Sequence, residues 1–564
     1  MSQPNRLDRM WERFIRHPKL ASLALGLLVA LGYPPVHGWW IAIPALAAFV
    51  ALLHRAPNWR AAAWCGWLFG WAHLTLANNW IATAFTHQAK MPEFLGWFAV
   101  PLLCVYLAVY PALAAGIAYA LARPPDGREA ILHEVAEAVK LRRIAPHEAS
   151  LAVFGALFAG VWIITEWARS WVFTGYPWPP LGLILLGGWD TPGLARVVPW
   201  FGTYALSGFM IILALGIASG LAHRQTLQTG LLVSAIALFM IMPRYAGPQD
   251  TDRTYRLVQP LIPQDEINDG SKFEEQFQRI ASLTAPGRES TRLVLWPESA
   301  VPDYLEDGYP SRYYARMTAG ADPDFARRRI AGLIGPKSTL LTGVVNLDFA
   351  AVEGFRRPVS ARNSVIAMDG DPDAGAAIQH SYDKAHLVPY GEYLPLVWLL
   401  EPLGLSRLTA GTVPYLPGPG PRTLDLGDHG KAGVQICYEI VFSGQVVDRD
   451  DRPDFLFNPS NDGWFGSWGP PQHLGQARLR AIEEGLPVLR STTTGISAVI
   501  DARGVVRATI PMGKSDAIDG LIPKAAPPTV FARFGNAVPL AWAAFLLVLA
   551  LGVPRLLALR SARG

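Results

Sequence analysis

The chain has few cysteines and few charged residues, and both shortages narrow its class. Its 564 residues include three cysteines, Cys65, Cys104 and Cys437, which is too few for a disulfide framework or a four-thiolate zinc site. Charged residues make up 17%, and the formal net charge of +4 is too small for so long a chain to predict a nucleic-acid partner. Hydrophobic residues reach 51%, which excludes a disordered, collagenous or coiled-coil protein. We therefore expect a membrane protein of several structural units.

Common catalytic and metal-binding motifs are also missing. The sequence has no His-Glu-x-x-His, no Gly-x-Ser-x-Gly, and no two of its 12 histidines at metal-ligand spacing. Gly513-Lys514-Ser515 resembles the end of a phosphate-binding loop, but Ala508 stands where the first glycine is needed. We interpret this segment as a turn. The sequence thus indicates neither a metalloenzyme nor a serine hydrolase.

Long apolar runs gather at both ends of the chain. Seven lie near the N-terminus and one near the C-terminus, at residues 20–33, 39–53, 61–84, 94–121, 151–171, 197–221, 227–242 and 537–553. A membrane-spanning helix needs about 20 apolar residues. The first two runs are shorter and fit a tilted or partly re-entrant hairpin. The pattern predicts about eight spans and no cleavable signal peptide.

The positive charges near the ends of these runs predict the orientation. Lys and Arg gather before residue 20, at 55–60, at 123–143, at 224 and after 554, whereas the intervening loops have few. Cytoplasmic loops carry such an excess, so we expect both termini in the cytoplasm and residues 246–530 outside it. Residues 122–150 are interpreted as a short amphipathic cytoplasmic connector.

One pair of charges lies inside an apolar run. Glu166 and Arg169 are one helical turn apart in the fifth run, near its outer end. Charges are costly within a membrane and often functional. The alternative is that the two side chains simply neutralise each other.

Residues 246–530 predict a soluble α/β domain, because short β-branched runs alternate there with helical patterns and turns. The predicted strands are 255–259, 292–296, 340–345, 364–368, 431–436, 455–458 and 498–500, and the predicted helices are 272–283, 324–333 and 475–484. We therefore divide the chain into a membrane domain (1–245), this domain (246–530), and a C-terminal span with a cytoplasmic tail (531–564).

Three short segments of this domain carry residues suited to covalent catalysis. They are residues 295–299, 382–392 and 435–439, each at the end of a predicted strand or in the loop after it, where α/β domains gather catalytic groups. The thiolate is the reactive form of Cys437, so the thiol needs a base or a cation beside it. Alone, Cys437 fits a buried structural thiol better. Together, the three segments favour a nucleophile.

Glu298, Lys384 and Cys437, in this order and in these contexts, resemble the triad of the nitrilase, or carbon-nitrogen hydrolase, superfamily. A nitrilase domain placed between seven spans and an eighth is similar to the bacterial apolipoprotein N-acyltransferase family, over nearly the whole chain. Residues 258–264, 458–466 and 480–483 match as well. The resemblance implies an αββα sandwich and no cofactor or metal. The family usually has Arg at Leu486 and Asn at Thr493, which leaves phospholipid preference and local loop geometry open.

The resemblance also implies a role for each residue of the triad. Glu298 is the expected general base, Lys384 the cation that stabilises the oxyanion, and Cys437 the nucleophile. The backbone N–H of Tyr438 is a further candidate donor to the oxyanion.

Three other polar residues match family positions, and each has a plainer alternative. Glu392 is expected to orient Lys384 or to steer the thiol proton, unless it is a surface glutamate. Glu439 is expected to order the turn after Cys437, unless it forms a structural salt bridge. Asn363 is expected near the site, unless it makes only a strand-edge hydrogen bond.

An apolar stretch, residues 393–403, follows the lysine segment directly. Soluble domains seldom expose such a stretch, and its tryptophan suits a membrane interface. We expect a mobile arm that enters the outer leaflet, with lipid contacts at Leu394, Val397, Trp398 and Leu400. A helix buried within the domain is the alternative.

The resemblance implies a ping-pong acyl transfer at the periplasmic side of the bacterial inner membrane. The expected donor is a phospholipid, with phosphatidylethanolamine as first candidate. The expected acceptor is the α-amine of the N-terminal diacylglyceryl-cysteine of an apolipoprotein. Two alternatives remain: a membrane-tethered amidase in which water resolves the thioester, and a non-catalytic membrane scaffold. The eight runs and the apolar arm weigh against the amidase, and the intact triad weighs against the scaffold.

Overall fold

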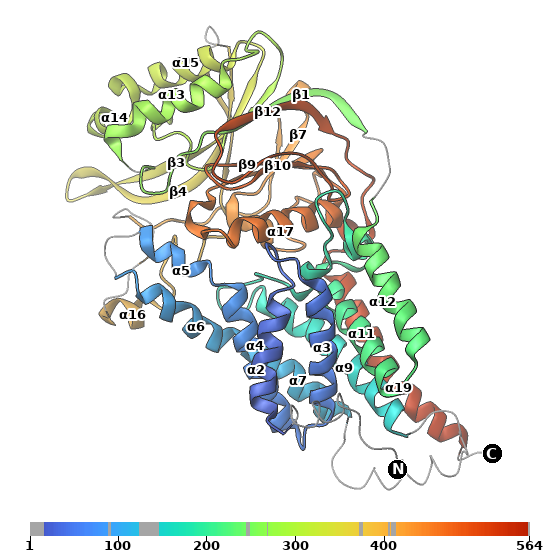
Figure 1. The fold of residues 1–564 in the computed structure, drawn as a ribbon. Helices are drawn as coiled ribbons and strands as arrows, with labels where there is room; N and C mark the ends of the chain where they lie inside the picture. Colours follow the sequence, from blue (N-terminus) through green and yellow to red (C-terminus); the bar gives the residue numbers. More distant parts are fainter. Residues whose placement is uncertain are drawn as a thin grey trace. The chain divides into compact units, whose positions relative to one another are not determined.

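The computed structural model describes residues 16–87, 92–122, 146–243, 249–267, 269–371, 376–403, 407 and 413–561. It divides into two compact units (Figure 1), the first formed by residues 1–79, 97–242 and 534–564 and the second by 80–96 and 243–533. The arm before residue 16 and residues 123–145 of the predicted connector lie outside the described residues.

The first unit is helical, as apolar segments must be if they are to satisfy their backbone groups in a membrane. Its longer helices are α2 (Pro18–Ala30), α3 (Trp39–His54), α4 (Trp59–Ala77), α6 (Leu95–Leu107), α7 (Val109–Ala122), α9 (Pro146–Arg169), α11 (Thr203–Ala222), α12 (Thr226–Ile241) and α19 (Ala537–Ser561). In the described part of the chain, three helical stretches are long and apolar enough to cross a membrane, Leu95–Ala122, Leu151–Arg169 and Thr203–Ala222. Shorter apolar stretches are Pro18–Ala30, Trp39–His54, Thr226–Ile241 and Ala537–Gly552. The count of about eight spans stays a prediction.

Two predicted runs are not continuous helices. The run over residues 61–84 ends as α4 at Ala77 and resumes as the short α5 (Ile81–Ala84), which belongs to the second unit. The run over 197–221 starts as α10 (Val198–Phe201) and breaks at Gly202, whose φ of +77° suits glycine. The long helix α11 begins only after that break.

Glu166 and Arg169 lie on α9, buried and 3.7 Å apart. Arg169 also donates to the carbonyl oxygens of Trp178 and Pro179, and Glu166 accepts from the N–H of Leu181. The pair thus fixes the irregular chain that follows α9, which is more than mutual neutralisation.

The second unit contains two six-stranded sheets. The first has the order β12 (Asp516–Pro523), β1 (Asp250–Gln259), β2 (Leu293–Leu295), β3 (Thr339–Val352), β4 (Phe355–Asp369), β5 (Ile378–Asp383). The second has the order β11 (Val506–Ile510), β10 (Ser497–Ile500), β9 (Val488–Thr492), β8 (Phe455–Ser460), β7 (Lys431–Val434), β6 (Thr423–Asp425). In each sheet three neighbouring strands are parallel, β1–β2–β3 and β7–β8–β9, and antiparallel strands flank them.

Polar contacts join the two sheets where β1 meets β9. The Ser491 hydroxyl donates to the carbonyl of Val258, and the Thr492 hydroxyl donates to the side-chain oxygen of Gln259. This seam fixes the two sheets against each other, so loops from both can contribute to one site.

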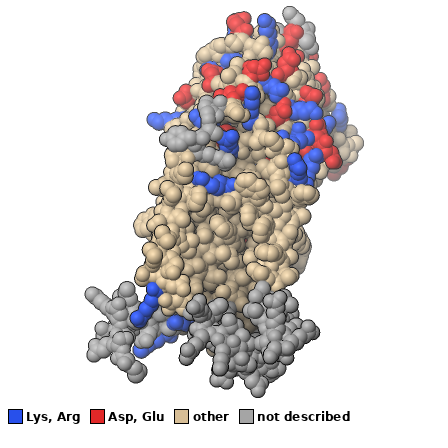
Figure 2. Space-filling view, turned by 90° about the vertical axis from the view of Figure 1, so that its right-hand side faces the viewer, with Lys and Arg blue, Asp and Glu red and all other residues tan. Residues whose placement is uncertain are grey.

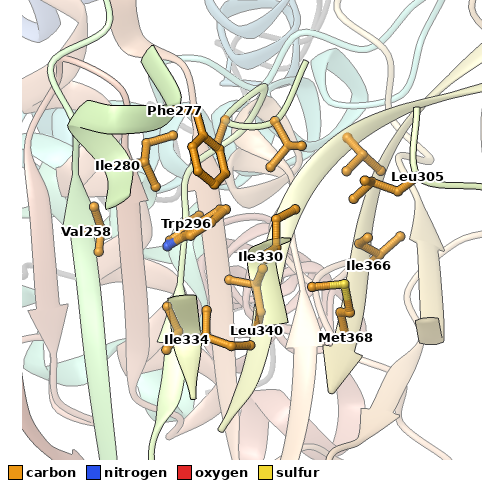
Figure 3. Packing of buried hydrophobic residues seen from close by; sticks show 14 of the residues in the cluster. Val258, Phe277, Ile280, Trp296, Leu305, Ile330, Ile334, Leu340, Ile366 and Met368 are labelled. Carbon is orange, nitrogen blue, oxygen red and sulfur yellow. The ribbon is translucent and has the colours of Figure 1, made fainter. Parts of the chain in front are cut away.

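Helices cover the sheets on both sides. The first sheet is covered by α13 (Phe273–Thr284) and α15 (Pro323–Ile334), whose apolar faces pack with Trp296 in one buried cluster (Figure 3). On the second sheet, α17 (Gly469–Glu484) contacts β9 and β10. The layers therefore run helix, sheet, sheet, helix, as the resemblance implied.

Candidate active site

The three candidate catalytic residues follow the ends of three strands of the second unit. Glu298 follows β2, Lys384 follows β5, and Cys437 begins the short helix η8 (Cys437–Val441) after β7. Each strand therefore delivers its side chain at its carboxyl end, where the sequence predicts the site.

Lys384 lies between two carboxylates. Its Nζ is 3.0 Å from Oε2 and 3.1 Å from Oε1 of Glu392, and 3.6 Å from Oε1 of Glu298. All three side chains are buried. Burial alone would lower the pKa of Lys384, but the charges of Glu392 and Glu298 outweigh it and raise that pKa above its ordinary value. Lys384 is therefore a permanent cation at neutral pH.

Neutral donors hold both carboxylates. The Asn363 amide, on β4, donates to Glu298 Oε1 at 2.7 Å and to Glu392 Oε1 at 2.9 Å. Backbone N–H groups complete the set, from Asn461 to Glu298 and from Val388 to Glu392, both at 2.8 Å. Asn363 thus links the two glutamates, and the alternative of a strand-edge hydrogen bond alone is wrong for its side chain.

Cys437 occupies a strained turn. Its φ of +51° lies in the left-handed region, which costs a non-glycine residue about 1–3 kcal/mol and is typical of functional sites. Its side chain is buried. Burial first, and then the charge of Glu298, raise the pKa of the thiol well above its ordinary value, while Lys384 opposes them. The side chain of Cys437 is therefore a thiol at neutral pH, and it would have to lose its proton to act as a nucleophile.

Glu439 ties this turn to the lysine segment. Its Oε2 accepts from the N–H of Ile436 at 2.8 Å, and its Oε1 accepts from the N–H of Ala385 at 2.7 Å and from the Tyr382 hydroxyl at 2.8 Å. Burial raises the pKa of Glu439 to about 7, although these donors favour the charged form. Glu439 orders the turn through hydrogen bonds and not through a salt bridge. Tyr438 is buried beside it, with its ring edge against Phe442.

The apolar stretch after Lys384 is largely exposed. Trp398 is 75% exposed, Leu396 and Val397 are about half exposed, and Leu394 and Leu400 are partly buried. The only regular helix described there is α16 (Val397–Leu400), with no buried residue. The alternative of a buried helix is wrong for these residues.

Two further groups at the site were not predicted as site residues. One is Asn461, which follows β8; it accepts a hydrogen bond from Thr493 and contacts Glu298 through its own N–H. Thr493, one of the two departures from the family pattern, thus takes part in holding the candidate base. Leu486, the other departure, is fully buried.

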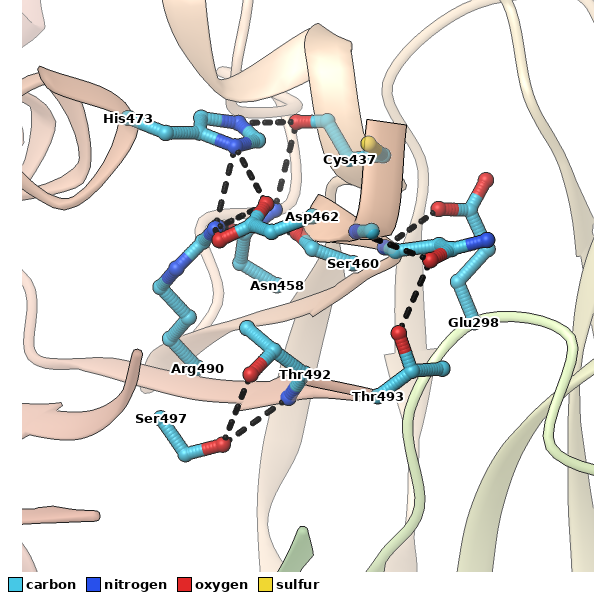
Figure 4. A network of polar contacts seen from close by, with 12 residues as sticks. Glu298, Cys437, Asn458, Ser460, Asp462, His473, Arg490, Thr492, Thr493 and Ser497 are labelled. Carbon is cyan, nitrogen blue, oxygen red and sulfur yellow. Dashed lines mark hydrogen bonds and ion pairs between the residues drawn. The ribbon is translucent and has the colours of Figure 1, made fainter. Parts of the chain in front are cut away.

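The second group is a buried polar chain behind Cys437, formed by Arg490, Asp462 and His473 (Figure 4). The sequence carries only a weak signal for it, because its members lie on three separate elements, Arg490 on β9, Asp462 on the short helix η9 (Asp462–Phe465) and His473 on α17. Within the described residues no group of three or more His, Cys, Asp and Glu side chains could hold a metal ion.

Comparisons with known proteins find relatives along nearly the whole chain. The family model for the apolipoprotein N-acyltransferase N-terminal domain matches residues 25–216, and the carbon-nitrogen hydrolase model matches residues 257–524. The chain is 31% identical to the apolipoprotein N-acyltransferase of Rhodopseudomonas palustris, over 93% of this chain and 92% of that protein. It is 32% identical to that of Caulobacter vibrioides (94% and 94%) and 34% identical to that of Bradyrhizobium diazoefficiens (92% and 91%). These similarities span both domains, and the chain belongs to the apolipoprotein N-acyltransferase family.

Proposed function

We propose that this enzyme moves an acyl chain from a phospholipid to the α-amine of the N-terminal diacylglyceryl-cysteine of an apolipoprotein, through a thioester on Cys437. The observation that carries the proposal is the buried cluster in which Lys384 contacts Glu298. Lys384 is also close enough to Cys437 for their charges to interact. Membership of the family supports the acceptor, and the cluster supports a covalent route.

In the first half-reaction the Cys437 sulfur attacks the ester carbonyl carbon of the phospholipid while Glu298 takes the thiol proton. The carbonyl oxygen becomes an oxyanion, held by the Lys384 ammonium and the N–H of Tyr438. When the intermediate collapses, the ester C–O bond breaks, and the leaving alkoxide takes the proton from Glu298. A lysophospholipid departs and the acyl group stays on sulfur.

In the second half-reaction the α-amine of the acceptor attacks the thioester carbonyl. The same oxyanion donors act again, and Glu298 accepts a proton from the amine. The C–S bond breaks, an amide forms, and the proton returns to the Cys437 thiolate. Water must stay away from the thioester, which the burial of the cluster favours.

The supporting residues act on the triad and not on the substrate. Glu392 binds the Lys384 ammonium more closely than Glu298 does, and we assign proton transfer to Glu298. Asn363 orients both carboxylates, and Glu439 fixes the turn that carries Cys437. These contacts support the roles that the resemblance implied.

The lipid side of the proposal rests on the exposed stretch around α16. Val397 and Trp398 present apolar surface one short segment after Lys384, with Leu394 and Leu400 beside them. We assign these side chains to lipid contacts that guide acyl chains to Cys437. Eight spans and a periplasmic catalytic domain in the bacterial inner membrane complete the proposal, with phosphatidylethanolamine as the donor.

Acyl transfer in detergent micelles tests the reaction. Phosphatidylethanolamine serves as donor and a diacylated lipopeptide as acceptor, and wild type is compared with Cys437→Ser and with Cys104→Ser, a control at another buried cysteine. Transfer should vanish only in Cys437→Ser, and mass spectrometry should find the acyl group on the Cys437 peptide when acceptor is omitted. Free fatty acid as sole product would support the hydrolase instead. No product with any lipid would support the scaffold.

A further inference from the structure

A buried chain of polar side chains ends at the backbone carbonyl of Cys437. The mechanism above does not use it. Arg490 donates from Nη2 to both carboxylate oxygens of Asp462, at 2.7 and 2.8 Å. The Nδ1 atom of His473 lies 2.9 Å from Asp462 Oδ1 and 3.0 Å from Arg490 Nη2. His473 Nε2 lies 3.0 Å from the backbone carbonyl oxygen of Cys437. Figure 4 shows the whole chain.

The direction of the last hydrogen bond is fixed by chemistry. A carbonyl oxygen only accepts, so Nε2 of His473 carries the proton and donates to Cys437. Burial first, and the charge of Arg490 next, lower the pKa of His473, while Asp462 opposes them. Arg490 and Asp462 neutralise each other, and all three side chains are nearly or fully buried.

The bond matters because of the peptide group on which it acts. The Cys437 carbonyl and the Tyr438 N–H belong to one peptide unit, which is planar and trans. Fixing the direction of the oxygen therefore fixes the opposite direction of the N–H. Cys437 has a positive φ, so the local backbone preference does not hold this peptide in place by itself.

The histidine ring is itself held from the side. Phe465 packs against it edge-on, with ring centroids 5.6 Å apart, and Trp80 packs against Phe465 at 4.6 Å. The ring can thus act as a rigid support for the peptide after the nucleophile.

We propose that His473, held by Asp462 and Arg490, is a positioning residue that aims the Tyr438 N–H at the oxyanion by binding the carbonyl of the same peptide group. The inference rests on the proposed function, in which that N–H stabilises the oxyanion. His473, Asp462 and Arg490 would thus affect the rate of catalysis without contacting the substrate.

Two substitutions at His473 test it. His473→Leu removes the donor, and His473→Gln keeps an N–H near the position of Nε2. The readouts are the single-turnover rate of thioester formation on Cys437 from phosphatidylethanolamine, KM and kcat for the full transfer, and the rate of Cys437 alkylation by iodoacetamide. Alkylation at sulfur forms no oxyanion, so it reports the thiol but not the Tyr438 N–H.

Because losing one oxyanion donor costs about 10²–10³-fold, we expect His473→Leu to slow thioester formation and kcat by at least about tenfold. KM and the alkylation rate should stay within about twofold, since neither depends on oxyanion stabilisation. His473→Gln should recover most of the lost rate. A merely structural role would instead slow alkylation and acylation together, with Gln as poor as Leu.

Thioester formation at the wild-type rate in His473→Leu would overturn the inference. So would parallel losses of acylation and alkylation in both variants. If wild type itself forms no thioester, the proposed function fails and not this inference alone. Should His473→Leu not fold, Phe465→Leu replaces it, because it loosens the ring without burying an unpaired polar group; unchanged acylation there would also overturn the inference.

Discussion

At the scale of single residues, the two glutamates beside Lys384 make different contacts. Glu392 contacts the ammonium with both oxygens, whereas Glu298 is farther from it and accepts from Asn363 and from a backbone N–H. These contacts support the proposal that Glu298 transfers the proton and Glu392 binds the cation.

Replacing Glu392 by Gln tests this division. The substitution removes the closest counter-charge of a buried cation, and hydrogen bonds to charged groups contribute about 1.5–3 kcal/mol, so kcat should fall by about ten- to a hundredfold. Lys384 would then keep its weaker contact with Glu298 but lose the charge of Glu392. Transfer in micelles measures the effect. Glu289→Gln, at an exposed glutamate, is the matched control and should leave kcat unchanged.

The buried thiol gives a pH prediction. Because burial and Glu298 raise the pKa of Cys437, little thiolate exists at neutral pH, and the thiolate fraction grows as pH rises toward that pKa. Alkylation of Cys437 should therefore increase about tenfold per pH unit from about pH 6 to about pH 9, without a plateau. Peptide mapping after iodoacetamide treatment measures the rate at this cysteine alone.

Glu298→Gln separates charge from base catalysis in the same assay. Removing the negative charge should lower the pKa of Cys437, so alkylation at a fixed pH should rise while acyl transfer is lost. A wild-type alkylation rate that stays constant from about pH 6 to about pH 9 would show a preformed thiolate and contradict the predicted pH dependence.

At the scale of elements, the short α5 shows where reading an apolar run fails. Apart from Thr83, residues 80–84 are apolar, and sequence alone placed them in one membrane run with α4. In the structure they belong to the second unit, where Trp80 packs on Phe465 and Thr83 lies against Gly466. Gly466 has a φ of +53° and no room for a side chain. An apolar side chain fits a protein core and a lipid bilayer equally well. Only its contacts in the folded structure show which environment it occupies.

The same limit explains which parts of the site could be predicted. Covalent chemistry needs particular side chains, so Glu298, Lys384 and Cys437 stood out from their segments. The central strands were predicted because they are short apolar runs bounded by turn residues. Strand β9 was missed because it carries the buried Arg490, whose partner Asp462 lies on a separate element, the short helix η9. A charged residue in a short segment predicts an exposed position unless its buried partner is known.

The segment around α16 gives the prediction at this scale. Trp398→Glu places a charge on a side chain that is 75% exposed, so folding stability should not change. Burying a large apolar side chain contributes about 1.5–3 kcal/mol, so losing this lipid contact should raise KM for phosphatidylethanolamine about tenfold, with a smaller change in kcat. Phe325→Glu, at an exposed aromatic of α15, is the control and should leave KM unchanged. An unchanged KM in Trp398→Glu would contradict the lipid contacts proposed for residues 393–403.

At the scale of the whole molecule, charge divides the chain as the membrane proposal requires. Figure 2 shows acidic and basic side chains gathered over the second unit, whereas the described surface of the helical unit is almost free of them on that face. Large apolar side chains are exposed on those helices, among them Trp97, Phe98 and Leu102. A soluble unit rarely exposes so much apolar surface, and a lipid-facing one must.

Cysteine labelling tests the orientation that the positive charges predict. All three native cysteines are buried, so a cysteine placed at an exposed site gives a clear signal. Ser290→Cys lies in the catalytic unit, and Gln228→Cys lies at the start of α12, after the basic loop at Arg224. In intact spheroplasts a membrane-impermeant maleimide should label Ser290→Cys at once and Gln228→Cys only after permeabilisation. Labelling in the reverse order would place the catalytic cluster in the cytoplasm, away from any acceptor exported across the membrane, and would overturn the proposed topology while leaving the chemistry at Cys437 intact.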